Sequence, residues 1–280
     1  MRFDLSGLHL ELHDPPPSCR RGLDAYWDGF RSSATEEAWL RIDCRREGTV
    51  RSRRVLYVGD LECEWTDGGA RFELEGARVR FDGERRASMT LAEPDDGSDY
   101  GFFLFLNLLL PLLAARLLED GGVLLHAAGA VLDDRAFVLV GEENAGKTTW
   151  AGLCREAGGI VVNDDVVVLR PDAEGIFRLH GVPLRVRGFG PPPRGAWPLA
   201  GLLLPKHGPT ASLAPAAPIA VEARVLANML HVAGLVDRDS RVADALTGLV
   251  GGVRAATLTF AKDPSFASLL RRWPQDLEDG

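Results

Sequence analysis

Residues 141–149 read Gly-Glu-Glu-Asn-Ala-Gly-Lys-Thr-Thr and satisfy the pattern G-x-x-x-x-G-K-[ST]. An apolar run, residues 136–140, precedes the pattern, and a predicted helix, residues 147–156, follows it. Glycines in such a loop let backbone N–H groups turn inward around phosphate oxygens, and the helix N-terminus adds a favourable dipole. The feature therefore predicts an α/β layer fold with a phosphate-binding loop between a buried strand and a helix.

The loop residues have distinct predicted roles. Lys147 is expected to reach the terminal phosphates of a nucleotide, and the Thr148 hydroxyl is expected to bind Mg²⁺. The complete predicted nucleotide-binding set is Gly141, Glu142, Glu143, Asn144, Ala145, Gly146, Lys147, Thr148 and Thr149. A chance match in a turn is the alternative, but the strand, the loop and the helix all occur in the required order.

Two adjacent carboxylates interrupt a second apolar run. Residues 159–163 lead into Asp164 and Asp165, and residues 166–169 are again apolar. In many phosphate-loop enzymes an aspartate serves the Mg²⁺ site. Neighbouring side chains on a regular strand face opposite ways, so both can serve one site only if the backbone bends. The alternative is a tight turn between two short strands, because Asn and Asp favour turns.

His126 lies within another apolar run, residues 122–132, which predicts a strand. A histidine in such a run is most often a hydrogen-bonded core residue, although titratable groups also mark functional pockets. His9 and His13 would lie about 13 Å apart in a strand at about 3.3 Å per residue, too far for one metal ion. The remaining histidines show no ligand spacing: His180, His207 and His231.

Charge and cysteine content narrow the class of protein. The chain has 280 residues, a formal net charge of −8 and no long Lys/Arg run, so a nucleic-acid partner is not expected. No secretory signal is recognised near Met1. The cysteines are scattered and form no C-x-x-C pair, which predicts reduced thiols and a cytoplasmic location: Cys19, Cys44, Cys63 and Cys154.

Residues 102–118 are strongly apolar, but Asn107 and Pro111 interrupt them and Arg116 follows closely. A membrane-spanning helix needs about 20 mostly apolar residues. We therefore predict a buried core helix and no membrane association.

Two domains are expected. Residues 1–98 predict a β-rich module because residues 3–5, 8–12, 71–75 and 77–81 alternate apolar and polar side chains. Residues 93–99 are polar, acidic and rich in helix and strand breakers, so the boundary is expected there. Residues 99–280 would form the catalytic domain. Its later predicted elements are strands at 199–204 and 256–260 and helices at 222–232 and 242–250.

The order Leu124-Leu125-His126, a hairpin, residues 141–148 and then Asn163 to Val167 resembles the catalytic core of HPr kinase/phosphorylase and its relatives. These relatives include kinases found beside lasso-peptide and other modified-peptide pathways. They are similar to ATP-dependent phosphoenolpyruvate carboxykinase, whose loop also continues as Gly-Lys-Thr-Thr. The resemblance covers about residues 100–270 and implies an α/β P-loop kinase core of this type with an N-terminal β-rich module.

The resemblance also implies residue roles. Lys147 and the loop amides would hold the phosphates of ATP, and Thr148 and Asp165 would bind Mg²⁺. Asp164 would accept the proton of the acceptor hydroxyl, and His126 would orient or tune Asp164. The implied reaction is transfer of the γ-phosphoryl group to a hydroxyl, first of all a serine of a precursor peptide or protein, with a homo-oligomer as one possible assembly. A small hydroxylated metabolite, HPr itself and a non-catalytic nucleotide sensor are the alternatives.

One segment departs from the family pattern. HPr kinases carry a glycine-rich, arginine-containing segment that serves their reverse, phosphorolytic reaction, and residues 181–195 do not match it well. Arg185, Arg187 or Arg194 could clamp a phosphoryl group, or could lie in a solvated loop. Ala261-Lys262-Asp263 lacks the Asn of guanine-reading motifs, so ATP is expected by resemblance alone.

Overall fold

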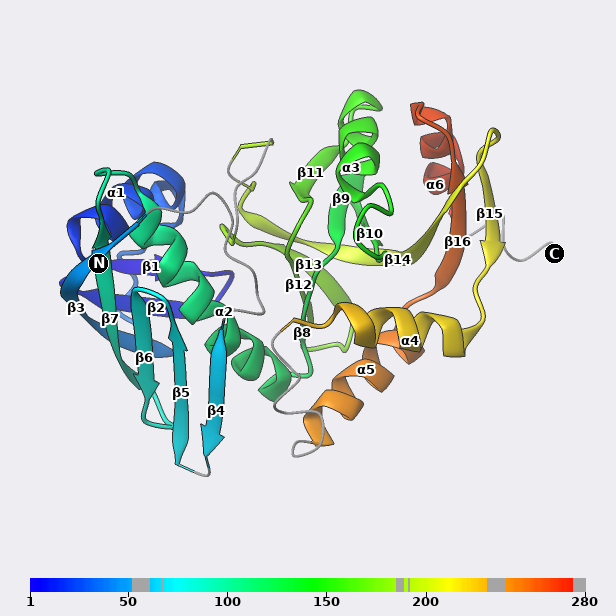
Figure 1. The fold of residues 1–280 in the computed structure, drawn as a ribbon. Helices are drawn as coiled ribbons and strands as arrows, with labels where there is room; N and C mark the ends of the chain where they lie inside the picture. The colour runs from blue at the N-terminus through cyan, green and yellow to red at the C-terminus, as the bar shows by residue number, and fades with distance from the viewer. Residues whose placement is uncertain (52–60, 67, 185–188, 191, 231–239, 274–280) are drawn as a thin grey trace. The chain divides into compact units, whose positions relative to one another are not determined.

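The computed structural model describes residues 1–51, 61–66, 68–184, 189–190, 192–230 and 240–273 (Figure 1). The predicted strand of residues 122–132, the predicted helices and the phosphate loop all fall wholly or largely within these ranges. Contacts divide the chain into two compact units, the first built on Met1–Leu113 and the second on Ala114–Val232 with Asp239–Gly280. The division falls inside helix α2 (Tyr100–Glu119), downstream of the boundary expected near residue 98.

The described part of the first unit contains a seven-stranded sheet, in the order β1-β2-β3-β7-β6-β5-β4. Strands β2, β3 and β7 are parallel, and the other neighbours are antiparallel. Alternating burial along β2 and β6 confirms the predicted strands with one wet face. The bounds are β1 (Arg2–Asp4), β2 (His9–His13), β3 (Leu40–Val50), β4 (Glu62–Thr66), β5 (Gly69–Leu74), β6 (Ala77–Phe81) and β7 (Arg86–Pro94).

Helix α1 (Pro17–Tyr26) is followed by the 3₁₀ turn η1 (Asp28–Phe30), and both contribute buried residues to this unit. Trp27, between them, is fully buried, and its ring lies 5.2 Å from Phe3 and 5.7 Å from Phe105. Proline can occupy the first turn of a helix because its missing N–H needs no partner there. Residues 15–17 are three consecutive prolines, a run that by itself predicts a stiff loop, but Pro17 opens helix α1.

Glu93 corrects the expectation of a free linker over residues 93–99. It lies within β7, and its side chain is buried beside the first turn of α1. Its Oε1 accepts hydrogen bonds from the Ser18 amide at 3.2 Å and the Ser18 hydroxyl at 3.0 Å. The acidic segment is thus anchored at its start by a contact 75 residues away in sequence.

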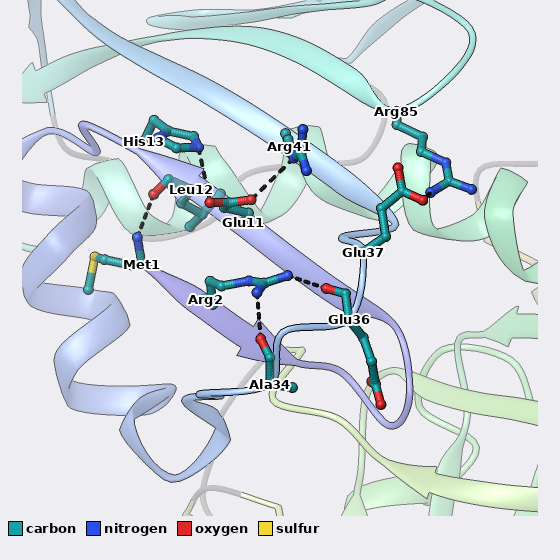
Figure 2. A network of polar contacts seen from close by, with 10 residues as sticks. All are labelled: Met1, Arg2, Glu11, Leu12, His13, Ala34, Glu36, Glu37, Arg41 and Arg85. Atoms are coloured by element: carbon teal, nitrogen blue, oxygen red, sulfur yellow. Dashed lines mark hydrogen bonds and ion pairs between the residues drawn. The ribbon is translucent and has the colours of Figure 1, made fainter.

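Polar contacts fix the N-terminal strands of the first unit (Figure 2). The Met1 ammonium donates to the Leu12 carbonyl at 2.7 Å, while Arg2 donates to the Ala34 and Glu36 carbonyls. Glu11 lies between His13 and Arg41, with its oxygens 3.4 Å from His13 Nε2 and 3.2 Å from Arg41 Nε. His13 is therefore engaged in an ordinary surface pair, whose contribution to stability is small.

Helix α2 confirms the predicted apolar helix over residues 102–118. It is long and apolar enough to cross a membrane, but 78% of its most apolar window is buried, which is also true of the core helix of a soluble protein. Pro111 lies inside it, and the Asn107 side chain donates to the Phe103 carbonyl at 2.7 Å within the helix. The polar interruptions seen in the sequence are thus accommodated without breaking the helix.

The described part of the second unit contains a nine-stranded sheet. Seven strands follow the order β11-β9-β10-β14-β13-β12-β8, with β16 on β14 and β15 on β16. Strands β10, β14 and β16 are parallel neighbours, whereas the other pairs are antiparallel. The bounds are β8 (Val123–Leu125), β9 (Ala128–Leu132), β10 (Arg135–Leu139), β11 (Ile160–Asn163), β12 (Val167–Pro171), β13 (Phe177–Gly181), β14 (Gly195–His207), β15 (Ser212–Pro215) and β16 (Ala255–Phe260).

The helices of this unit are α3 (Lys147–Glu156), α4 (Pro218–Asn228), α5 (Ser240–Gly252) and α6 (Ala267–Arg272), with the 3₁₀ turn η3 (Pro264–Phe266) before α6. Helix α3 packs on β9 and β11 (Figure 1). Its Trp150 stacks with Phe266, with the ring centroids 6.4 Å apart. Two sheets with associated helices confirm the expected mixed α/β class.

One predicted strand is in fact two. The run at residues 122–132 breaks after Leu125 and resumes at Ala128, so β8 pairs with β12 while β9 pairs with β10 and β11. The expectation that His126 lies in mid-strand is therefore wrong. It lies in the break between β8 and β9, where its side chain is 34% exposed.

The cysteines are free, as their spacing predicts. Cys19, Cys44 and Cys154 are buried and Cys63 is exposed. Burial is the main cause that raises the pKa of the Cys44 thiol to about 12, so this thiol stays protonated at neutral pH.

Candidate functional site

The phosphate loop lies between the carboxyl end of β10 and the first turn of α3. Asn144 and Gly146 have left-handed backbone conformations, with φ of +62° and +91°. A Cβ on Gly141 would lie only 2.7 Å from the Pro205 Cγ, so only glycine fits there. The first amides of α3 have no acceptor inside the helix, which leaves their N–H groups for an anion.

Lys147 is a buried cation within this loop, only 7% exposed. Its Nζ donates to the Gly141 carbonyl at 3.0 Å and to the Glu142 carbonyl at 2.9 Å. Burial lowers the pKa of Lys147, and the negative charges of Asp165 and Glu143 partly oppose that shift. The ammonium is thus held by the loop's own carbonyls, in electrostatic reach of Asp165.

Asp164 and Asp165 occupy the bend between β11 and β12, and each is 8% exposed. The Asn163 side-chain oxygen accepts hydrogen bonds from the amides of Asp165 at 2.9 Å and Val166 at 3.0 Å, which closes the bend. The structure thus contains the turn that the sequence offered as an alternative. Because this bend interrupts the alternation of a regular strand, it also supplies the departure needed for both carboxylates to serve one site.

His126 contacts Asp165. Its Nδ1 lies 3.0 Å from the Asp165 Oδ1 and 2.9 Å from the Asp165 carbonyl oxygen. The antiparallel register pairs Leu125 with Val167 at the end of the β8–β12 ladder. His126 therefore lies just beyond that ladder, close to Asp165. The contact thus differs from the expected one with Asp164, and Asp165 interacts with both His126 and Lys147.

Helix α4 touches this site at two points that the sequence does not reveal. The Arg224 NH1 lies 2.5 Å from the Glu142 Oε1 in the phosphate loop. The Asn228 carbonyl accepts the His126 amide at 2.8 Å, and the Asn228 side chain donates to the Arg224 carbonyl at 2.8 Å. A buried amide in an apolar helix is the one signal that could have drawn attention to Asn228.

The remaining loop residues lie where the motif predicts. Thr148 and Thr149 are exposed in the first turn of α3, and Glu143 is exposed in the loop. Arg194, one of the three candidate phosphoryl-binding arginines, is exposed, whereas the other two, Arg185 and Arg187, lie outside the described ranges, as does His231.

The residues of the site fit Mg²⁺. Within the described ranges, no group of three or more His, Cys, Asp or Glu residues could hold a metal ion by itself. Mg²⁺ commonly takes one or two protein oxygens and completes its shell with water and substrate phosphates. The Thr148 hydroxyl and the Asp165 carboxylate are hard oxygen ligands of this kind, so an incomplete protein shell is compatible with the expected ion.

Comparison with known proteins yields a distant structural match. No protein-family model matches the chain, and no curated protein matches it. The structure of the HPr(Ser) kinase/phosphatase from Coxiella burnetii is similar, with 13% sequence identity and a TM-score of 0.32. The match covers 56% of this chain and 99% of that chain. This is a distant structural relationship, and the chemistry of the site rests on its own residues.

Proposed function

We propose that this protein is a kinase that transfers the γ-phosphoryl group of ATP to a hydroxyl, most specifically a serine of a precursor peptide or protein. One observation carries the proposal: the buried lysine of a phosphate loop interacts electrostatically with Asp165, one of two adjacent buried carboxylates. Buried charges are costly without a role. Phosphoryl transfer needs this set, because it depends on positioning and on neutralising charge.

The nucleotide phosphates would bind the loop amides and Lys147. The Lys147 ammonium already donates to two loop carbonyls, so little reorganisation is needed for one of those bonds to pass to a phosphate oxygen. Thr148 and Asp165 would hold Mg²⁺, which when bound supplies charge neutralisation over the phosphate oxygens. His126 would fix the orientation of Asp165 through its Nδ1.

Asp164 is the other carboxylate of the acidic bend and would act as the base. The acceptor oxygen forms a bond to the γ-phosphorus while the bond from that phosphorus to the β–γ bridging oxygen breaks. The hydroxyl proton passes to Asp164, and ADP leaves with the electron pair of the broken bond. The role first expected for His126, orienting Asp164, passes to Asp165 because that is the carboxylate it contacts.

The acceptor is proposed to carry a hydroxyl group. A peptide or protein serine is favoured by the resemblance to peptide-directed kinases, and the β-rich N-terminal unit is proposed to capture it. A small hydroxylated metabolite and HPr are the competing acceptors. A cytoplasmic location and a homo-oligomer remain part of this hypothesis.

The test is acceptor-dependent transfer. The full-length protein is mixed with ATP·Mg²⁺ and serine-containing peptides, an HPr protein or small alcohols, and is followed by phosphorus NMR and acceptor mass. We expect ADP and a phosphorylated acceptor, both abolished in Lys147→Ala. Transfer that persists in Lys147→Ala would refute the assignment of this loop.

A nucleotide sensor is the second candidate, and a specific observation favours it. Asn163 closes the acidic bend through backbone amides, so part of this sequence has a purely structural role. A sensor would bind ATP through Lys147. The Asp164→Asn substitution would then leave the rate of phosphate release unchanged. A kinase would lose transfer in that variant while still binding nucleotide.

A further inference from the structure

The ion pair between helix α4 and the phosphate loop is exchangeable. Glu142 is the second residue of the loop, and its carboxylate lies 2.5 Å from the Arg224 guanidinium. The Glu142 side chain is 79% exposed and the Arg224 side chain is 34% exposed. Exposed pairs of this kind contribute little to stability. A stronger anion arriving at the loop can therefore displace Glu142 at small cost.

A nucleotide brings such an anion. Guanidinium groups bind phosphate oxygens bidentately, in a geometry that matches the planar fork. A terminal phosphate carries more charge than the single Glu142 carboxylate and would lie within the loop to which that carboxylate belongs. Lys147 is the buried cation of the loop. A second cation would complete the neutralisation of charge that phosphoryl transfer requires.

We infer that Arg224 is a second phosphate-binding cation, held at the loop by Glu142 in the free protein and transferred to the terminal phosphate when ATP binds. The inference rests on the proposed function and deepens it. It names a residue of α4, outside the loop motif, as part of the same site.

The backbone of α4 supports this role. Asn228 donates its side-chain amide to the Arg224 carbonyl at 2.8 Å, and its own carbonyl accepts the His126 amide at 2.8 Å. Leu230 donates its amide to the Leu124 carbonyl at 2.9 Å. The end of the helix is therefore fixed to β8 and to the residue that contacts Asp165. Arg224 thus extends from a support shared with the acidic part of the site.

The role predicts opposite effects for the two partners. Arg224→Ala should weaken ATP·Mg²⁺ binding about tenfold or more, the range of a charge-assisted hydrogen bond, and should weaken adenosine binding not at all. Glu142→Gln removes the competing carboxylate and should tighten ATP·Mg²⁺ binding about two- to fivefold, as expected for a weak exposed pair. In the double variant the Glu142→Gln gain should vanish, because the cation it releases is gone.

A matched control is available in the same unit. Arg178 Nε lies 2.7 Å from Asp172 Oδ2, and the Arg178 side chain is 32% exposed. Arg178→Ala removes an arginine of similar exposure and pairing outside the phosphate loop. It should bind ATP·Mg²⁺ as the wild type does. Arg224→Lys keeps the charge but loses the fork, so its affinity should lie between those of the wild type and Arg224→Ala.

The experiment is isothermal titration of ATP·Mg²⁺, ADP·Mg²⁺ and adenosine into these full-length variants, with folding checked by circular dichroism. Wild-type affinity for ATP·Mg²⁺ in Arg224→Ala would overturn the inference while leaving the proposed function intact, provided Lys147→Ala still abolishes binding. Equal weakening in Glu142→Gln and Arg224→Ala would also overturn it, since the pair would then be structural. No binding by the wild type would overturn both the inference and the proposed function.

Discussion

The two units differ in what they do with buried polar groups. In the first unit, the buried Ser18 and Glu93 bond to each other, and Asn107 bonds within its own helix. Among the described residues of the second unit, the buried polar ones belong to the phosphate loop, the acidic bend and the end of α4: Lys147, Asn163, Asp164, Asp165 and Asn228. Burial of polar groups in the first unit joins parts of the fold, whereas in the second it assembles charges that can act on a ligand.

The buried polar residues of the two units should therefore affect different properties of the protein. A buried polar pair whose partners satisfy each other stabilises the native state when both are present. A buried lysine whose pKa is lowered by burial is held at a cost to stability. Changes in the first unit should therefore alter the free energy of unfolding, and changes in the site of the second should alter binding and transfer.

The largest effect is expected at Asp164. Asp164→Asn should lower the rate of phosphoryl transfer about 10²- to 10⁴-fold, the usual contribution of a positioned base. Nucleotide affinity, measured by titration, should stay near that of the wild type. The matched Asp165→Asn variant should instead shift the Mg²⁺ concentration needed for activity. Unchanged transfer in Asp164→Asn would mean that another group accepts the proton.

Trp27→Ala should give the largest loss of stability. Trp27 is fully buried among Phe3, Phe102 and Phe105, so its removal leaves a large cavity. The expected cost is about 3–5 kcal/mol, measured by urea unfolding. ATP affinity under native conditions should not change. A clear loss of ATP affinity in the folded Trp27→Ala variant would contradict the view that the first unit governs stability and the second governs binding.

Falling pH should destabilise the protein through His180. Burial, followed by the charges of Arg170 and Arg178, lowers the pKa of this residue to about 4. The ordinary value in an unfolded chain is about 6.5, so the unfolded state binds the proton first as pH falls. The contribution of neutral His180 to the free energy of unfolding is therefore fully present above about pH 6.5. It falls by about a few kcal/mol as the pH is lowered toward 4. Urea midpoints of His180→Gln should show a smaller decline over this interval, and an equal decline would remove His180 as the cause.

The smallest of these effects is expected for Ser18→Ala. The change removes the 3.0 Å hydrogen bond to Glu93 but leaves the Ser18 amide bond in place. The partly unsatisfied carboxylate should cost about 1–3 kcal/mol of unfolding free energy. The double change Ser18→Ala with Glu93→Gln should recover part of that loss, because the uncompensated charge is gone. A loss that is no smaller in the double variant would show that the charge of Glu93 is not the cause.

Local sequence patterns predicted the elements whose cause is local. Helix α3 begins at Lys147, directly after the left-handed Gly146 of the phosphate-loop pattern, and β6 has the expected bounds because its residues alternate between turns. Helix α1 was missed because three consecutive prolines suggest a loop, although one of them can open a helix. The anchoring of Glu93 was missed because its partner is distant in sequence.

The residues of the site also divide into those that a local motif predicts and those that only tertiary packing brings together. The phosphate loop and the acidic pair are short motifs, so their residues could be named from the sequence. The partner of His126 depends on the strand break and on the register of β8 against β12. The approach of Arg224 to Glu142 joins residues 82 positions apart. No periodicity or spacing carries that information, since only tertiary packing brings α4 to the loop.

The most direct test of the central claim is titration of ATP·Mg²⁺ into the full-length wild type and Lys147→Ala. We expect saturable binding to the wild type and its loss in a variant that remains folded, because the buried Lys147 ammonium is the loop's principal cation. Equal binding by both proteins, or none by the wild type, would contradict the assignment of residues 141–149 as a nucleotide site.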